Sequence, residues 1–180
     1  GCTLEHAGYV LSWLIAMFGS VTRVVSASAE VIPDKPGGAH APDVSVTTLY
    51  FEVGPMVRLT CSIVASHDHR LRVFGDTGVL QVREVWNNAA AVRFYRRFTL
   101  RRRLIERGPS HPKVGRWGAA SMNFALGPAE MLAALAEGRA CRLTNAMALH
   151  LTEVTLALQG PSGVVEIASR CAPMEVAAWV

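Results

Sequence analysis

The sequence lacks the short motifs that most often reveal a metal or nucleotide site. Its four cysteines, Cys2, Cys61, Cys141 and Cys171, form no Cys-x-x-Cys pair, so we expect no zinc site of the finger or ribbon type. Neither Gly-x-Gly-x-x-Gly nor Gly-Lys-Ser/Thr occurs, and these are the loops that cradle the phosphates of a dinucleotide or a nucleoside triphosphate. We therefore predict that this chain alone binds no metal and no nucleotide cofactor.

The chain also lacks an apolar run long enough to cross a membrane. The candidate run, residues 7–18, is well short of the ~20 residues that a spanning helix needs. SASAE at residues 26–30 resembles a signal-peptidase site, but Glu5 stands where a signal peptide carries positive charge. We therefore expect a cytoplasmic protein with reduced, buried thiols and no membrane partner. Because the chain begins with Gly1, we interpret it as a fragment of a longer protein.

Charged residues are few and unevenly distributed. They make up 18% of the chain, against 51% hydrophobic residues, a balance typical of a globular domain. Residues 93–116, which we call the basic arm, contain eight Arg and one Lys against one acid, Glu106, whereas the rest carries nine basic and thirteen acidic residues. Arginines interleaved with aromatic rings suit nucleic acid. The acidic remainder, without a known nucleic-acid module, instead favours a solvated arm or a contact with an acidic neighbour.

Apolar spacing predicts the secondary structure. Residues 4–18 carry an apolar stripe at helical spacing, and Gly19 is placed to end that helix. The stripe consists of Leu4, Ala7, Leu11, Leu14 or Ile15, and Phe18. A Pro- and Gly-rich surface loop is expected at residues 33–43. Strands are expected at residues 21–32, 44–53, 56–65, 71–74 and 79–85, with another within 89–99.

The apolar period becomes helical again towards the C-terminus. One helix is expected to begin near Leu126, with Pro128 at its first position, and a second after a cap at Thr144 or Asn145. Residues 163–170 predict a closing strand. This order of elements indicates one α+β domain over residues 1–180, in which helices cover one face of an open, mainly antiparallel sheet.

A glycine pair in LRVFGDTGVLQV, residues 71–82, could mark a phosphate loop or a hairpin turn. A phosphate loop must lead into a helix whose N-terminal amides face the ligand, but the residues after Gly78 continue as a strand. We therefore predict a hairpin with a three-residue connection, Asp76 to Gly78, in which Gly78 supplies a positive φ.

Four segments in this order resemble the C-terminal domain of the Gfo/Idh/MocA family (glucose–fructose oxidoreductase, inositol dehydrogenase and rhizopine catabolism). They are residues 4–27, 71–82, 127–159 and 172–179. The resemblance implies an NAD(P)-dependent oxidoreductase acting on a sugar-like or polyol substrate, with NAD or NADP bound by an N-terminal Rossmann domain that this chain does not contain. It also implies a homo-oligomer assembled through the open sheet, here the strands within residues 44–85.

The resemblance further implies that catalytic residues lie on the first helix. Many family members carry Asp and His four residues apart there, and the His transfers a proton to or from a sugar hydroxyl. The matching positions hold Glu5 and Tyr9, which share one helix face. Tyrosine is a poorer base than histidine at neutral pH, so His6, about 100° around the helix from Glu5, is a further candidate. This departure leaves a non-enzymatic interaction domain as the alternative function.

Two other histidine positions suggest sites. His67 and His69 could approach one metal ion from a strand, but no third ligand is evident, and a polar loop is the favoured interpretation. His150 lies within the apolar sequence MALHLTEV, where a hydrogen-bonded structural histidine is commoner than a catalytic one.

Overall fold

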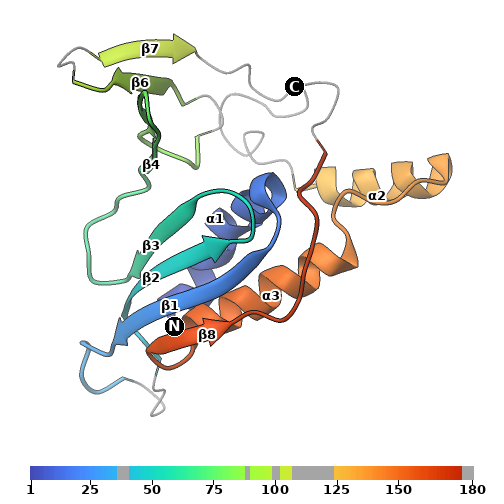
Figure 1. Ribbon diagram of the computed structural model, residues 1–180. Coiled ribbons are helices and arrows are strands. Elements are labelled where there is room, and N and C mark those ends of the chain that lie inside the picture. The colour runs from blue at the N-terminus through green and yellow to red at the C-terminus, as the bar shows by residue number, and fades with distance from the viewer. Residues whose placement is uncertain (36–40, 88–89, 99–101, 107–123, 176–180) are drawn as a thin grey trace. The chain divides into compact units, whose positions relative to one another are not determined.

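The computed structural model describes residues 1–35, 41–87, 90–98, 102–106 and 124–175, with the backbone alone for 102–106 (Figure 1). The helices are α1 (Cys2–Phe18), α2 (Leu126–Glu137) and α3 (Asn145–Gln159). The strands are β1 (Val21–Ala29), β2 (Val44–Phe51), β3 (Met56–Ser62), β4 (Leu71–Phe74), β5 (Gly78–Val82), β6 (Val92–Arg96), β7 (Arg102–Glu106) and β8 (Gly163–Glu166). No helix in the described ranges is long and apolar enough to span a bilayer.

The strands form two antiparallel sheets. Sheet A has the order β3-β2-β1-β8 and lies in a first compact unit, Gly1–Ala65 with Met131–Glu175; sheet B has the order β4-β5-β6-β7 and lies in the second, Ser66–Glu130. The predicted α+β class is confirmed, but the strands within residues 44–85 do not form one sheet. The chain leaves sheet A after β3, where the Ser62 hydroxyl accepts hydrogen bonds from the Val64 and Ala65 N–H groups and turns the backbone.

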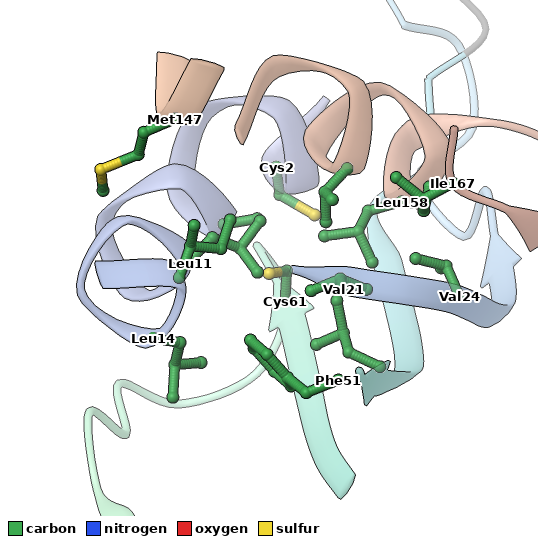
Figure 2. Packing of buried hydrophobic residues seen from close by; sticks show 14 residues of the cluster. Cys2, Leu11, Leu14, Val21, Val24, Phe51, Cys61, Met147, Leu158 and Ile167 are labelled. Atoms are coloured by element: carbon green, nitrogen blue, oxygen red, sulfur yellow. The ribbon is translucent and has the colours of Figure 1, made fainter. Parts of the chain in front are cut away.

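Helices α1 and α3 cover the same face of sheet A, which we call the inner face (Figure 1). Their apolar side chains meet those of β1 and β2 in a continuous core (Figure 2). The most deeply buried aliphatic side chains are Leu11, Ile15, Val24, Leu49 and Leu158, each with no exposed surface. Burial of a side chain of this size contributes about 1.5–3 kcal/mol, so this layer stabilises the first unit and fixes which side of α1 faces inward.

Helix α1 turns the predicted face inward, with Leu4 as the exception. The buried residues include Thr3, Ala7, Leu11 and Leu14, whereas Leu4 is 50% exposed. The buried stripe runs through Thr3, and Leu4 is about 100° away around the helix. The predicted end at Gly19 is confirmed: this residue has φ 74° and its N–H bonds to Ile15 O at 2.8 Å.

The predicted cap of α3 is confirmed at Thr144. Its hydroxyl accepts a hydrogen bond from the Met147 N–H at 3.1 Å, which satisfies one of the free N–H groups at the helix start. The buried face carries Met147, Val154 and Leu158. In α2, Pro128 is the third residue and not the first as predicted, because the helix already begins at Leu126.

The glycine pair at residues 75–78 forms the predicted hairpin turn, with different geometry. Gly75 and Gly78 exchange N–H···O bonds of 2.9 and 3.3 Å, so the connection is only Asp76 and Thr77. Gly78 does not have a positive φ. It is required for another reason: a Cβ there would lie 2.2 Å from Tyr95 O on the paired strand and 2.7 Å from the Phe94 ring.

Gly78→Ala is expected to loosen sheet B. The added methyl group must displace β6, and overpacking of this kind costs about 1–3 kcal/mol. Amide hydrogen exchange in β5 and β6 should become faster, and the free energy of unfolding should fall by that amount. Gly75→Ala is the matched control, because its Cβ would meet nothing closer than 3.9 Å and should cost less than about 0.5 kcal/mol. Equal effects of the two substitutions would contradict this role of Gly78.

Candidate functional site

Three titratable side chains lie together on the outward face of α1. Since Ala7 and Leu11 point into the core, Glu5, His6 and Tyr9 are directed to solvent, and Tyr9 is 56% exposed. Tyr9 is the i+4 neighbour of Glu5 and the i+3 neighbour of His6, positions whose side chains adjoin on a helix surface. The fold thus brings together the three candidates that the sequence singled out.

The backbone of α1 holds the His6 imidazole in place. Its Nδ1 lies 3.2 Å from the Cys2 carbonyl oxygen. A carbonyl only accepts, so Nδ1 carries the proton and Nε2 of the neutral ring has a free lone pair. His6 can therefore accept a proton at Nε2, while the Tyr9 hydroxyl and the Glu5 carboxylate supply a second proton-exchanging group and a negative charge beside it.

Glu5, His6 and Tyr9 are not among the residues that line the pocket of the second unit. This pocket, of about 360 Å³, is lined by Ser66, Arg83, Glu84 and residues 67–70. The face of α1 around Glu5 and Tyr9 also exposes Leu4 and Met17, each about half. Titratable groups among exposed apolar side chains are typical of a surface that another domain or molecule covers.

His67 and His69 lie in a polar loop before β4, as the favoured interpretation predicted. Nε2 of His67 is 2.9 Å from Nδ1 of His69, which is also 3.0 Å from the Glu84 carboxylate. The neighbouring Asp68 accepts hydrogen bonds from the Arg70 guanidinium, which with the Arg70 N–H lowers the pKa of Asp68 to about 2. Within the described ranges, no three His, Cys, Asp or Glu side chains are placed to hold a metal ion.

His150 is a structural residue at the centre of the first unit, as predicted. It is fully buried, and its Nε2 accepts a hydrogen bond from the Val21 N–H at 2.9 Å. Nδ1 therefore carries the proton and donates to the Ser169 hydroxyl at 2.9 Å. Glu153, one turn further along α3, accepts from the N–H groups of Ala168 and Ser169. These contacts join α3 to β1 and to the segment after β8.

All four cysteines are free, with Cys2 and Cys61 buried and Cys141 and Cys171 partly exposed. Burial, together with the nearby Cys2, raises the pKa of the Cys61 thiol to about 11. A thiol with so high a pKa stays protonated at neutral pH and is a poor nucleophile. Cys61 is therefore a core residue, and sequence spacing alone could not distinguish the two buried thiols from the others.

The basic arm is described only in part. β6 contributes Arg93 and Arg96, and β7 continues the sheet, while residues 99–101 and 107–116 lie outside the described residues. The predicted strand within residues 89–99 is confirmed as β6. The last part of the C-terminal family segment, residues 176–179, also lies outside the described residues.

Burial lowers the pKa of His150, which predicts a pH-dependent stability. The unfolded chain, with an ordinary histidine pKa near ~6.5, binds a proton that the folded state resists. Stability should be fully present above that pH and should fall by up to about 1.4 kcal/mol per pH unit as the pH decreases below about 6.5. Denaturant unfolding at stepped pH measures this slope.

His150→Leu is the matched test of that assignment. It should flatten the slope, and it should destabilise the protein by about 1–3 kcal/mol, because the Val21 N–H loses its partner. His6→Gln, at an exposed position, should retain the wild-type slope. A slope that persists in His150→Leu would assign the pH dependence to other groups.

Part of this chain matches a known protein family. Residues 1–81 match the family model described as the GFO/IDH/MocA C-terminal domain, which confirms the resemblance found in the sequence. No curated protein matches the chain.

Several solved structures share the fold. A levoglucosan dehydrogenase in complex with NADH and L-sorbose is 18% identical over 94% of this chain and 50% of its own, with a TM-score of 0.68. An oxidoreductase domain protein from Kribbella flavida is 19% identical over 94% and 50%, with a TM-score of 0.65. An inositol dehydrogenase homologue from Azotobacter vinelandii, complexed with NAD⁺, is 18% identical over 91% and 48%, with a TM-score of 0.56. The chain spans about half the length of these proteins.

Proposed function

Because residues 1–81 match the C-terminal domain of the GFO/IDH/MocA family, we propose that this chain is the substrate-binding part of an NAD(P)-dependent oxidoreductase that acts on a sugar-like or polyol substrate. The observation that carries the proposal is the cluster of Glu5, His6 and Tyr9 on the exposed face of α1. Fold relatives crystallised with NADH and L-sorbose, or with NADH and levoglucosan, support this substrate class.

The chain's own glycine-rich turn does not fit a nucleotide phosphate. The N–H groups of Gly75 and Gly78 are each bonded to the other residue's carbonyl, and the chain continues into β5 and not into a helix. Free backbone N–H groups at a helix N-terminus are what a phosphate site requires. We therefore propose that NAD or NADP is bound by a separate N-terminal domain, and that this chain alone is inactive.

In this proposal the residues of α1 handle the proton of the substrate hydroxyl. The Tyr9 hydroxyl exchanges a proton with that group, and Glu5, one turn earlier, orients it and adds negative charge. His6 is the second candidate base, through the lone pair on Nε2 that its bond to Cys2 leaves free.

Tyr9→Phe in the complete enzyme tests this role. The substitution removes only a hydroxyl from a largely exposed ring, so turnover should fall by a factor on the order of 10²–10⁴ while the free energy of unfolding changes little. Tyr50→Phe, on the opposite side of sheet A, is the matched control and should leave turnover within about twofold. Retained turnover in Tyr9→Phe, with loss in His6→Gln, would transfer the role to His6.

The second candidate function is a non-enzymatic interaction domain that keeps the fold. It is favoured by Glu5 and Tyr9 standing where many family members carry Asp and His. If the complete wild-type protein shows no turnover but still assembles, this alternative is favoured. A Gly-x-Gly-x-x-Gly strand–helix unit encoded before Gly1 would favour the enzyme.

We also propose that a second copy covers the outer face of sheet A, the face opposite α1 and α3. The register pairs Val46 with Ala27 and Val25 with Val164, which places these apolar side chains in adjacent rows on one face. Val46 and Val164 are 44% and 62% exposed. An open sheet of this kind is commonly covered in an assembly.

Val46→Lys is expected to dissociate that assembly, because a charge would be buried without a partner. Sedimentation velocity should show an oligomer for the wild type and a monomer for the variant. Leu156→Lys, on the outward side of α3 where the side chain is 57% exposed, should leave the oligomer intact. A monomeric, folded wild type at micromolar concentration would contradict the proposal.

A further inference from the structure

We propose that sheet B binds a single-stranded polynucleotide, through a face that carries arginines and through two hairpin tips that carry exposed aromatic rings. This activity is independent of the oxidoreductase function proposed above, because all the residues that carry it lie in the second unit. It differs from the expectation that the basic arm contacts an acidic neighbour, and the reasons lie in the register and in the contacts of the arginines.

Positive charge is concentrated in the second unit. Residues 66–130 contain twelve Lys and Arg against five Asp and Glu, whereas the residues of the first unit contain six against nine. The net positive charge of the second unit attracts polyanions, whereas the net negative charge of the first unit repels them. The two units thus differ in the class of ligand that their charge favours.

The strand register places several arginines on one face of sheet B. Arg72 pairs with Gln81, and Gln81 pairs with Arg93, so these three side chains form one cross-strand row. Arg72 and Arg93 are two strands apart, about 9–10 Å at the usual strand spacing. The next row on the same face holds Phe74, Val79 and Tyr95. Neither row contains an acidic residue; the carboxylate that interacts electrostatically with Arg72 is Asp68, in the loop before β4.

The guanidinium groups of this face have unused donors. Among the described residues, Arg93 has no hydrogen bond or ion pair, and neither does Arg83, the residue that follows β5. The Arg72 guanidinium carbon lies 5.8 Å from the centroid of the Phe74 ring, and Arg72 also interacts electrostatically with Asp68. By contrast, Arg70 is fully engaged with Asp68. Arg72 and Arg83 are exposed and Arg93 is half-buried. Guanidinium N–H donors without partners are suited to phosphate oxygens.

Exposed aromatic rings lie at the hairpin tips of the same sheet. Phe74 is 71% exposed and Phe98 is 94% exposed. Phe98 has φ 63°, a conformation that is costly for a residue with a side chain and that concentrates at functional sites. The Arg97 guanidinium stacks on its ring at 5.0 Å, and the Arg97 N–H bonds to Thr77 O, which joins the two tips. Each ring has a second side on which a base can stack.

A polynucleotide fits this arrangement better than an acidic protein surface does. Arg72 on β4 and Arg93 on β6, with Arg83 just after β5, match charges that repeat along a chain, and aromatic rings add a surface on which bases stack. Two acids of the first unit are already engaged within the chain: Asp43 bonds to Val31, Ile32 and Lys35, and Glu166 pairs with Arg23.

Fluorescence anisotropy with a fluorescein-labelled single-stranded oligonucleotide of about 20 residues, longer than the 4–16 that one small fold covers, tests the proposal on the full chain. Each phosphate contact contributes about −0.7 to the slope of log affinity against log salt concentration, so about three contacts predict a slope near roughly −2. The affinity should then fall about 20-fold between about 50 and 200 mM salt. Arg93→Gln should weaken binding roughly 3- to 10-fold and lower the slope by about 0.7. Phe98→Ser should weaken it roughly 5- to 100-fold, as loss of one stacking ring does.

The controls separate this site from general charge attraction. Arg58→Gln removes one exposed arginine from sheet A and should leave affinity unchanged, and Arg93→Lys keeps the charge and should keep the salt slope. Circular dichroism establishes that each variant is folded. Equal losses in Arg58→Gln and Arg93→Gln, or no binding at low salt, would overturn the proposal. Binding to phosphatidylserine vesicles without binding to the oligonucleotide would also overturn it, in favour of a membrane surface.

Discussion

The first unit depends on one buried hydrogen-bonded histidine. His150 is neutral because burial disfavours its charged form, and it is satisfied at both nitrogens, by Val21 on β1 and by Ser169 after β8. A buried polar group with both partners present fixes the register of the elements that it joins. Once α3 is held against β1 in this way, α1 must pack beside it on the same face of sheet A. That packing turns Glu5, His6 and Tyr9 outward.

Much of this first unit could be predicted because its signals are local. Gly19 ends α1 and Thr144 caps α3 through contacts within a few residues, and such contacts are encoded in short stretches of sequence. The division of the strands into two sheets could not be predicted in this way. It depends on β1 pairing with β8, which joins Val24 to Val165, and on Ser62 turning the chain away after β3.

The sequence predicted which residues form the candidate site, but only part of their structural surroundings. Spacing alone placed Glu5 and Tyr9 on one face of a helix, but it assigned Leu4 to the core and could not show that His6 is held by the Cys2 carbonyl. Gly78 illustrates the same limit. Its position in a turn is readable from sequence, whereas its purpose is a close approach to Tyr95 O from another strand, and that contact exists only after sheet B has formed.

Charged residues have different roles in the two units. In the first unit, carboxylates act as structural acceptors. Burial of Asp43 opposes its ionisation, but hydrogen bonds from Ile32, Lys35 and Val31 outweigh that cost and hold its pKa below the usual range; Glu153 similarly accepts two backbone N–H groups. In the second unit, Arg83 and Arg93 have no such partners among the described residues. A donor that folding leaves unused costs little while it is hydrated, and it stays available to an anion. Charged side chains that have partners within the fold therefore stabilise the first unit. Arginines that have none in the second unit remain able to bind an anion.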